Sequence, residues 1–312
     1  MVTLTVFTPT YNRANLLARG YNSLRNQTCH DFKWLIIDDG SKDETRSLVL
    51  SWLCKDSLFL TERGFIGHST DCPWFEIRYE FKENGGLHTG YNAAIELMDT
   101  EICVCIDSDD FMPEDGVEHC VKGWEQYGTT SIAGLVGYDY TIQGKRLGEK
   151  MDEGRVIHYV QLKQDKRYQA DNKIVLRVDL LKQVAPQPTF PGEKNFNPIW
   201  MIFKVDQLFP FVLMDKTLCI VDYQDSGMAA NIVNQYFNSP RSFVELRKLY
   251  VSLKYSSLMW RVKHYIHLVA DAKIAKVNPF SLGVNNFAVL LFYPLGILLW
   301  MYLNKQRKMI VQ

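Results

Sequence analysis

The chain has 312 residues, of which 47% are hydrophobic and 22% are charged, and its 35 basic side chains balance 35 acidic ones. This length and composition allow one large domain or two modest ones, and they exclude a disulfide-stapled mini-protein, a coiled coil and a disordered chain. The charge is unevenly spread: 11 basic and 2 acidic residues lie from Asn238 onward, so an acidic body of net −9 precedes a basic tail of net +9. Such tails commonly meet nucleic acid or an anionic membrane surface.

Strand-like and helix-like segments alternate over the first third of the chain. Short apolar segments predict strands at 4–8, 33–38, 75–81 and 101–107, and helical patterns follow at about 15–27, from 42, and at 89–98. Strands that are apolar on both faces and alternate with helices imply an α/β fold with a mostly parallel sheet covered on both sides. The segment 54–73 has no clear period, and we expect an inserted surface excursion there.

The C-terminal part has the composition of amphipathic helices from Pro240 onward. Residues 287–303 carry no charge, but Pro294 and Gly296 interrupt this run, which is slightly shorter than the ~20 apolar residues of a membrane span. Basic residues flank it on both sides, so both ends prefer the cytoplasmic side. We expect a helical, membrane-associated tail that re-enters, lies in the interface or crosses as a single segment, with a buried core helix as the alternative.

The seven cysteines are odd in number and include no Cys-x-x-Cys pair, which favours a reducing cytosolic compartment. The N-terminus enters a strand-like segment without a basic region or a long apolar core, so no signal peptide is expected. Together with the basic tail, these features predict a location at the cytoplasmic face of the cell membrane.

Polar groups follow three of the predicted strands. Asp107 and Asp109 end the fourth strand and offer the hard oxygen ligands that suit Mg²⁺ or Mn²⁺ shared with substrate phosphates. Tyr11, after the first strand, offers a flat face to a nucleobase, and Asp39, after the second, offers an acceptor to a base imide or ribose hydroxyl. In open α/β sheets ligands bind outside the carboxyl ends of strands. Turn packing for Tyr11 and a helix N-cap for Asp39 are the alternatives.

A glycine-rich loop precedes the helix predicted at 89–98. Gly85 and Gly86 permit a sharp turn and close backbone approach to a ligand, and the following helix offers free N–H groups to anionic oxygens. The loop is neither a Walker loop nor a Gly-x-Gly-x-x-Gly fingerprint.

These motifs together resemble those of family 2 glycosyltransferases with the GT-A fold, of the bacterial type that assembles surface polysaccharides. The resemblance rests on Thr8-Pro-Thr-Tyr-Asn12, Ile37-Asp-Asp-Gly-Ser-Lys-Asp43, Asn84-Gly-Gly86 and Asp107-Ser-Asp-Asp110, in this order over residues 1–125. It implies a glycosyltransferase domain at 1–238, with a nucleotide-sugar-binding half at 1–125 and an acceptor half at 126–238, before the membrane-associated region at 239–312. The nucleotide-sugar-binding residues that it implies are Thr8, Pro9, Tyr11, Asp39, Asn84, Gly85, Gly86, Asn92, Asp107 and Ser108, and the metal ligands for Mn²⁺ or Mg²⁺ are Asp107 and Asp109.

The resemblance further implies an inverting, metal-dependent transferase of a hexosyl or N-acetylhexosaminyl group. The donor would be a nucleotide-diphosphate sugar, most commonly a UDP-sugar, and the acceptor a lipid-linked glycan of capsule, exopolysaccharide or lipopolysaccharide assembly; no nucleic acid is expected. Glu193 is the candidate base that takes the acceptor proton, and Asp206 is the alternative. A second acid is missing where Asn197-Pro198-Ile199 stands. Direct transfer to polyprenyl phosphate and a non-catalytic nucleotide-sugar-binding or scaffold protein are the competing hypotheses.

Overall fold

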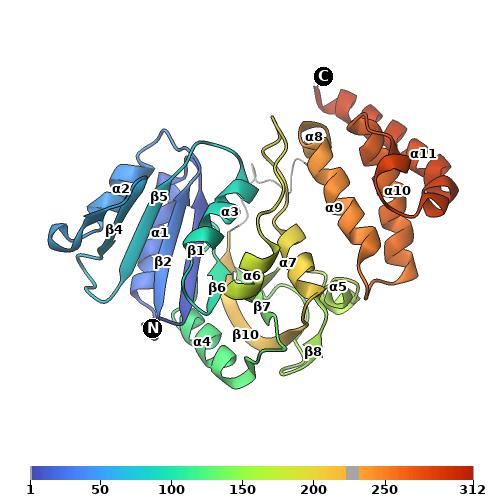
Figure 1. Ribbon diagram of the computed structural model, residues 1–312. Helices are drawn as coiled ribbons and strands as arrows, with labels where there is room; N and C mark the ends of the chain where they lie inside the picture. The colour runs from blue at the N-terminus through green and yellow to red at the C-terminus, as the bar shows by residue number, and fades with distance from the viewer. Residues whose placement is uncertain (1, 223–231, 312) are drawn as a thin grey trace.

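One mixed sheet forms the centre of the computed structural model, which describes residues 2–222 and 232–311 (Figure 1). Its strands are β1 (Leu4–Thr10), β2 (Phe32–Asp38), β3 (Phe59–Leu60), β4 (Gly64–His68), β5 (Glu76–Phe81), β6 (Ile102–Cys105), β7 (Gly134–Thr141), β8 (Val156–Ile157), β9 (Asn172–Arg177) and β10 (Phe211–Val221). They lie in the order β3-β4-β5-β2-β1-β6-β9-β7-β10-β8. The run β5-β2-β1-β6 is parallel, and β9 is antiparallel to both of its neighbours.

Helices cover both faces of this sheet (Figure 1). The helices are α1 (Ala14–Arg25), α2 (Thr45–Ser51), α3 (Leu87–Leu97), α4 (Gly116–Tyr127), α5 (Tyr159–Leu162), α6 (Val178–Val184), α7 (Ile199–Asp206), α8 (Ile232–Asn238), α9 (Pro240–Ser252), α10 (Leu258–Ile274) and α11 (Asn286–Val311). Side chains of α1, α2 and α4 share one core cluster, and those of α3, α6, α7 and α9 share another. The predicted α/β fold class is therefore confirmed.

The central strands alternate their side chains between these two cores. Trp34 and Ile36 of β2 join the α1 side, whereas Leu35 and Ile37 join the α3 side, and all four are buried. Both faces of the strand bury apolar surface, which explains why these strands are recognisable as continuous apolar segments.

The expected irregular excursion at 54–73 is wrong, because this segment extends the sheet. β3 and β4 form an antiparallel hairpin, and β4 pairs with β5. A side chain at Gly64 would lie 1.8 Å from the Tyr79 carbonyl oxygen, so a glycine is needed where the two strands meet. β4 contains two glycines, Gly64 and Gly67, which interrupt the alternation of apolar and polar side chains by which a strand is recognised in a sequence.

The C-terminal helices α9, α10 and α11 share a third core of their own. It contains Val251, Leu268, Val269 and Val289, while Leu246 and Tyr250 of α9 pack into the core beneath the sheet. α9 therefore joins the C-terminal helices to the rest of the molecule. The division of the chain at residue 239 stays a prediction.

Candidate active site

Two turns at the carboxyl edge of the sheet are fastened together by hydrogen bonds. The Asn12 amide donates to Ser41 Oγ (2.8 Å), and the Lys42 amide donates to Asn12 Oδ1 (2.8 Å). Asn12 takes the left-handed backbone conformation that this short turn requires (φ 52°). Tyr11 projects from the same turn with 46% of its surface exposed. Its ring is therefore accessible at the edge where a ligand was expected.

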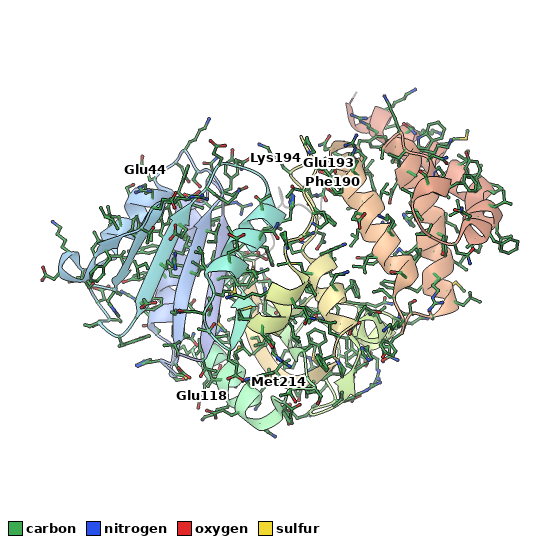
Figure 2. The ribbon with its side chains drawn as sticks, in the orientation of Figure 1. Glu44, Glu118, Phe190, Glu193, Lys194 and Met214 are labelled. Atoms are coloured by element: carbon green, nitrogen blue, oxygen red, sulfur yellow. The ribbon has the colours of Figure 1, made fainter. Side chains whose placement is uncertain are left out.

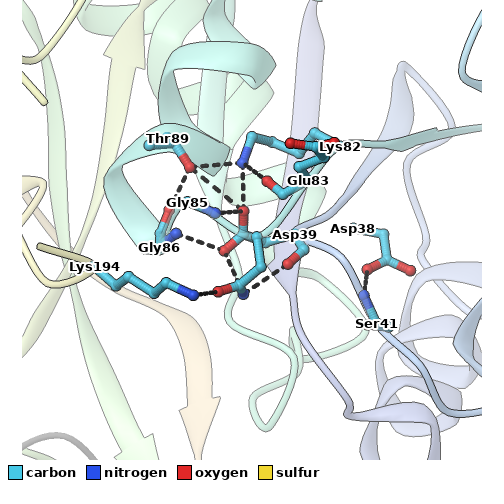
Figure 3. Close-up of polar contacts among 10 residues, drawn as sticks. Asp38, Asp39, Ser41, Lys82, Glu83, Gly85, Gly86, Thr89 and Lys194 are labelled. Carbon is cyan, nitrogen blue, oxygen red and sulfur yellow. Dashed lines mark hydrogen bonds and ion pairs between the residues drawn. The ribbon is translucent and has the colours of Figure 1, made fainter. Parts of the chain in front are cut away.

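Asp39 faces the glycine-rich loop, with its carboxylate beside the amides of Gly85 and Gly86, and anchors it (Figure 3). Its Oδ1 accepts from the amide of Gly85 (2.9 Å), and its Oδ2 accepts from the amide of Gly86 (2.8 Å). The Lys82 ammonium and the Asn84 side-chain amide donate to the same carboxylate, which is 4% exposed. The N-cap alternative is wrong, because the following helix α2 begins at Thr45 with Glu44 as its N-cap. The loop supplies four donors to the Asp39 carboxylate, and the expected role of Asp39 toward a nucleotide stays a prediction.

The other side of the loop contacts the segment that contains Lys194 (Figures 2 and 3). Lys194 Nζ donates to Asn84 Oδ1 (2.5 Å). Gly86 has a φ of +97°, and a Cβ atom there would lie 1.9 Å from the Lys194 carbonyl oxygen. The loop is thus held by Asp39 on one side and by Lys194 on the other.

The aspartates after β6 have different surroundings. Asp107 is exposed, and its Oδ1 meets only the weak donor Cys105 Sγ at 3.8 Å, among the contacts of the described chain. Asp109 pairs with Arg13 (3.1 Å). Asp110 is buried, and burial raises its pKa to about 6, against the opposing effect of Lys173 at 3.5 Å. Asp107 and Asp109 therefore lie toward solvent, whereas Asp110 belongs to the interior.

A buried charge cluster behind these aspartates was not predicted. Lys173 of β9 faces Asp110 and Asp139 of β7, and burial raises the pKa of Asp139 to about 7. The lysine side chain is 12% exposed, and its partial burial disfavours the charged form, but Cys219 and the surrounding aspartates raise its pKa well above the ordinary value. A single lysine at the start of an apolar strand was the available signal, since lysine is rarely buried without a partner.

The described residues fit a divalent cation only in part. They contain no group of three or more histidine, cysteine or acidic side chains suited to a metal. Asp107 and Asp109 supply two hard oxygen donors, and the second already pairs with Arg13. Such a pair suits Mg²⁺ or Mn²⁺ whose remaining ligands come from a diphosphate and water.

Glu193 does not have the surroundings expected of a free base. Its Oε1 accepts from the Arg241 amide (2.9 Å), and its Oε2 accepts from the amide and hydroxyl of Ser242 (2.8 and 2.7 Å). The side chain is 9% exposed and caps the start of α9, where a negative charge is favourable. This geometry speaks against the predicted role and assigns Glu193 an anchoring one.

Asp206, the alternative base, is buried completely and is also a helix cap. Its carboxylate accepts from the amides of Tyr159 (2.6 Å) and Val160 (3.3 Å) at the start of α5. An acceptor hydroxyl has no access to it. The alternative is therefore wrong for this structure.

Two further residues of the implied donor site have structural partners instead. The Asn92 side chain pairs in both directions with the Gln187 backbone (2.8 and 2.9 Å). The Thr8 hydroxyl is buried and accepts from Trp34 Nε1 (2.9 Å). Pro9 packs beside Gly90, and Ser108 is buried. For Asn92 and Thr8, these contacts argue against direct donor binding and explain the motif by packing.

Comparison with protein families gives a match to the model described as glycosyl transferase family 2, over residues 5–183. A chondroitin synthase and a hyaluronan synthase of Pasteurella multocida are each 30% identical over 119 residues, which is 38% of this chain. The match covers only 10% of either relative. This chain therefore corresponds to only a small part of the length of those enzymes.

Solved structures share the fold at low sequence identity. Staphylococcus aureus TarS, residues 1–349 in complex with UDP-GlcNAc, superposes with a TM-score of 0.58 at 14% identity, covering 91% of this chain and 76% of that one. The mannosyltransferase PcManGT of Pyrobaculum calidifontis, in complex with GDP-Man and Mn²⁺, has a TM-score of 0.54 at 15% identity, covering 98% and 83%. Both support the predicted GT-A architecture.

Proposed function

Because the chain belongs to glycosyl transferase family 2 and is a glycosyltransferase, we propose that it moves one sugar from a UDP-sugar to a lipid-linked glycan, with inversion at the anomeric carbon. The pathway would be capsule, exopolysaccharide or lipopolysaccharide assembly. The enzyme would act at the cytoplasmic face of the membrane, and nucleic acid would have no part in it.

The observation that carries this proposal is the convergence of four segments at one sheet edge. Tyr11, Asp39, the glycine-rich loop and the outward carboxylates Asp107 and Asp109 follow β1, β2, β5 and β6 respectively, which are parallel neighbours. The switch in strand order lies between β1 and β6, the position at which ligands bind in such sheets. TarS, crystallised with UDP-GlcNAc, has the same fold, which supports a nucleotide-sugar donor.

Charge at this edge suits a diphosphate that leaves with growing negative charge. Asp107 and Asp109 would hold Mg²⁺ or Mn²⁺, which when bound supplies a Lewis acid for the diphosphate. Arg13 and Lys82 place two further positive charges beside Asp109 and Asp39. Tyr11 would stack on the base, and the loop amides would remain fixed by Asp39.

A second candidate function is a non-catalytic nucleotide-sugar-binding protein. It is favoured by the observation that Glu193 and Asp206 are both occupied as helix caps. Neither carboxylate is free to accept a proton from an acceptor hydroxyl.

A panel of nucleotide sugars, tested with and without Mn²⁺, separates the two candidates. Calorimetry measures binding, and release of nucleoside diphosphate measures turnover. The proposed enzyme binds one nucleotide sugar and releases its diphosphate in a chelator-sensitive manner. Binding without release on any acceptor, including polyprenyl phosphate and lipid-linked glycan, would identify the binding protein instead.

The C-terminal region supports a membrane-bound acceptor. α11 is the one helix of the described residues that is long and apolar enough to cross a membrane, over Asn286–Met309, and 17% of its most apolar window is buried. Basic residues surround it. The wild-type enzyme should therefore transfer faster to a lipid-linked acceptor in vesicles than to the same glycan in solution.

A further inference from the structure

The exposed apolar side chains of α11 lie on one face of the helix. At 100° per residue they fall within a sector of about 140°. They are 48–74% exposed, and the members of this exposed stripe are Phe287, Leu290, Leu291, Leu295, Leu298, Met301, Tyr302 and Met309. A contiguous apolar surface of this kind needs an occupant.

The opposite face of α11 is packed on α10. Val289 and Leu303 are buried on it. Between them, a Cβ atom at Gly296 would lie 2.4 Å from Val269 Cβ, so the glycine brings the two helices into close contact. α11 thus divides lengthwise into a protein-facing half and an exposed half.

This division is incompatible with a span through a bilayer. α10 carries Arg261, Lys263 and Lys273, and it packs in turn on α9, which is joined to the core beneath the sheet. If α11 crossed the membrane, its packed face would draw these charged side chains into the hydrocarbon region, which is costly. Only the exposed stripe can meet lipid.

The charge of the C-terminal helices indicates which surface they meet. Their two acidic residues are both neutralised within the protein: Asp271 is fully buried against Arg247 (3.2 Å), and Glu245 pairs with Lys248 (2.7 Å). The nine other basic residues from Asn238 onward therefore dominate the charge of this region. Lys305, Arg307 and Lys308 stand at the end of the stripe itself. This charge complements an anionic lipid surface.

We propose that α11 lies flat in one leaflet of an anionic membrane, with the exposed stripe inserted and both helix ends on the side of the sheet domain. The proposal specifies the geometry of the membrane association included in the proposed function. It is independent of the donor and of the reaction, because it depends only on α9, α10 and α11.

Vesicle binding of the full-length protein tests the surface. The probes are vesicles of phosphatidylcholine with and without phosphatidylglycerol, and the readout is co-sedimentation. L291Q/L298Q replaces two stripe residues by polar residues of similar size and should weaken binding by about tenfold or more, since each leucine loses its apolar burial. The control F59Q/L60Q alters two apolar residues of the edge strand β3 that are even more exposed, at 70% and 79%, and should bind like wild type.

A C-terminal epitope tag tests the orientation. When the folded protein is added to preformed vesicles, protease outside should remove the tag from bound protein, because both ends of α11 stay on that side. A protected tag would overturn the flat geometry in favour of a span. Equal binding of L291Q/L298Q and wild type would overturn the lipid surface, and a dimer that this variant converts to monomer would assign the stripe to a second copy of the chain.

Nucleotide-sugar binding is measured on every variant. The proposed function fails if wild type binds and turns over no nucleotide sugar, whatever the vesicles show. The proposed membrane geometry of α11 is contradicted only by the co-sedimentation and tag-protection results, whatever the nucleotide-sugar assays show. The two failures are therefore distinguishable.

Discussion

Single residues at the carboxyl edge are fixed by their neighbours as much as by their own chemistry. Asp39 was expected to face a ligand, and the structure gives it four donors from one loop. A carboxylate so occupied holds the loop in one conformation, and the loop then presents its outer surface to the donor. Loss of the anchor should therefore disorder the loop before it affects any direct contact.

Gly86→Ala is expected to destabilise the protein much more than Gly192→Ala. Both positions have positive φ, +97° and +80°, so both variants incur backbone strain of about 1–3 kcal/mol, and the ψ of 165° at Gly86 lies in a region that is essentially restricted to glycine. Only at position 86 does the new methyl group meet a carbonyl oxygen, at 1.9 Å, whereas nothing lies within 4 Å at position 192. Urea unfolding and donor affinity measure the difference; equal losses in both variants would remove the close contact as the cause.

Asp109→Ala should abolish transfer while the fold stays intact. The side chain is partly exposed and pairs with Arg13 at the surface, so little packing is lost. Mn²⁺ affinity in the presence of nucleoside diphosphate should fall with it. Turnover near wild type in the presence of chelator would disprove the metal role of Asp107 and Asp109.

Glu193→Gln distinguishes an anchoring role from a catalytic one. As the cap of α9, the charged side chain should contribute about 0.5–2 kcal/mol, and the variant should lose this stability with a modest loss of rate. A base would instead show a fall in turnover of roughly 10²–10⁴-fold at unchanged stability. Thermal unfolding and turnover, measured on the same preparation, decide between them.

At the scale of elements, buried polar side chains join α9 and α10. Arg247 of α9 reaches into it and bonds both Asp271 (3.2 Å) and His264 Nδ1 (3.0 Å). Burial, together with this guanidinium, lowers the pKa of His264 to about 2 and that of His267 to about 3. The folded protein therefore keeps both rings neutral.

The two histidines of this cluster make the stability of the protein depend on pH in mild acid. The unfolded chain binds protons at both histidines below pH of about 6.5, and the folded chain does not, so the contribution of these histidines to stability falls as the pH drops from about 6.5 toward 3. Asp271 acts in the opposite direction, because burial raises its pKa to about 6 and the folded chain therefore binds its proton at a higher pH than the unfolded chain does. His267→Gln removes one of these protons. Its free energy of unfolding should depend on pH less steeply than that of wild type, by up to about 1.4 kcal/mol per pH unit. Parallel curves for the two proteins between pH 7 and 5 would contradict the prediction.

Strands that bury apolar side chains on both faces could be predicted from the sequence. A strand whose position depends on a close contact between backbones could not. β1, β2 and β6 are buried at almost every position and rich in apolar residues, which reveals them directly. β5 is recognised instead by its apolar residues at alternating positions between charged ones. β4 can pair with β5 because Gly64 has no side chain to collide with the Tyr79 carbonyl oxygen. A close backbone contact of this kind produces no periodic pattern of hydrophobic residues in the sequence. The helix α11 continues through Pro294, where a break was plausible, because its packed face on α10 supports it.

The residues of the candidate site also fall into a group whose position could be predicted and a group whose role could not. Asp107, Asp109 and Tyr11 are exposed groups at strand ends, and their position follows from the order of the strands. Asn92 and Glu193 were expected at the donor and the acceptor because their motifs match, but their partners, Gln187 and Ser242, are about 50 to 95 residues away. Such tertiary hydrogen bonds leave no local signal in the sequence.

At the scale of the whole molecule, deletion from Pro279 onward is expected to harm folding as well as membrane binding. The cut removes the residues that cover Leu268 and Val269 of α10, both fully buried. Exposed core leucine and valine cost about 1.5–3 kcal/mol each. The truncated protein should unfold at lower temperature than L291Q/L298Q, measured by circular dichroism, and an unchanged melting temperature would show that α11 is not part of the core.

A path of direct contacts runs from the donor loop to the membrane helix. Lys194 touches the loop, its neighbour Glu193 caps α9, and α9 shares a core with α10 and α11 (Figure 2). Two ligands that bind one folded body obey reciprocal linkage: whatever factor a vesicle applies to the donor dissociation constant, the donor applies to vesicle partitioning. A change in vesicle partitioning when donor is added therefore measures how strongly the two sites are coupled. The protein in solution and the protein on the membrane need not have the same affinity for the donor.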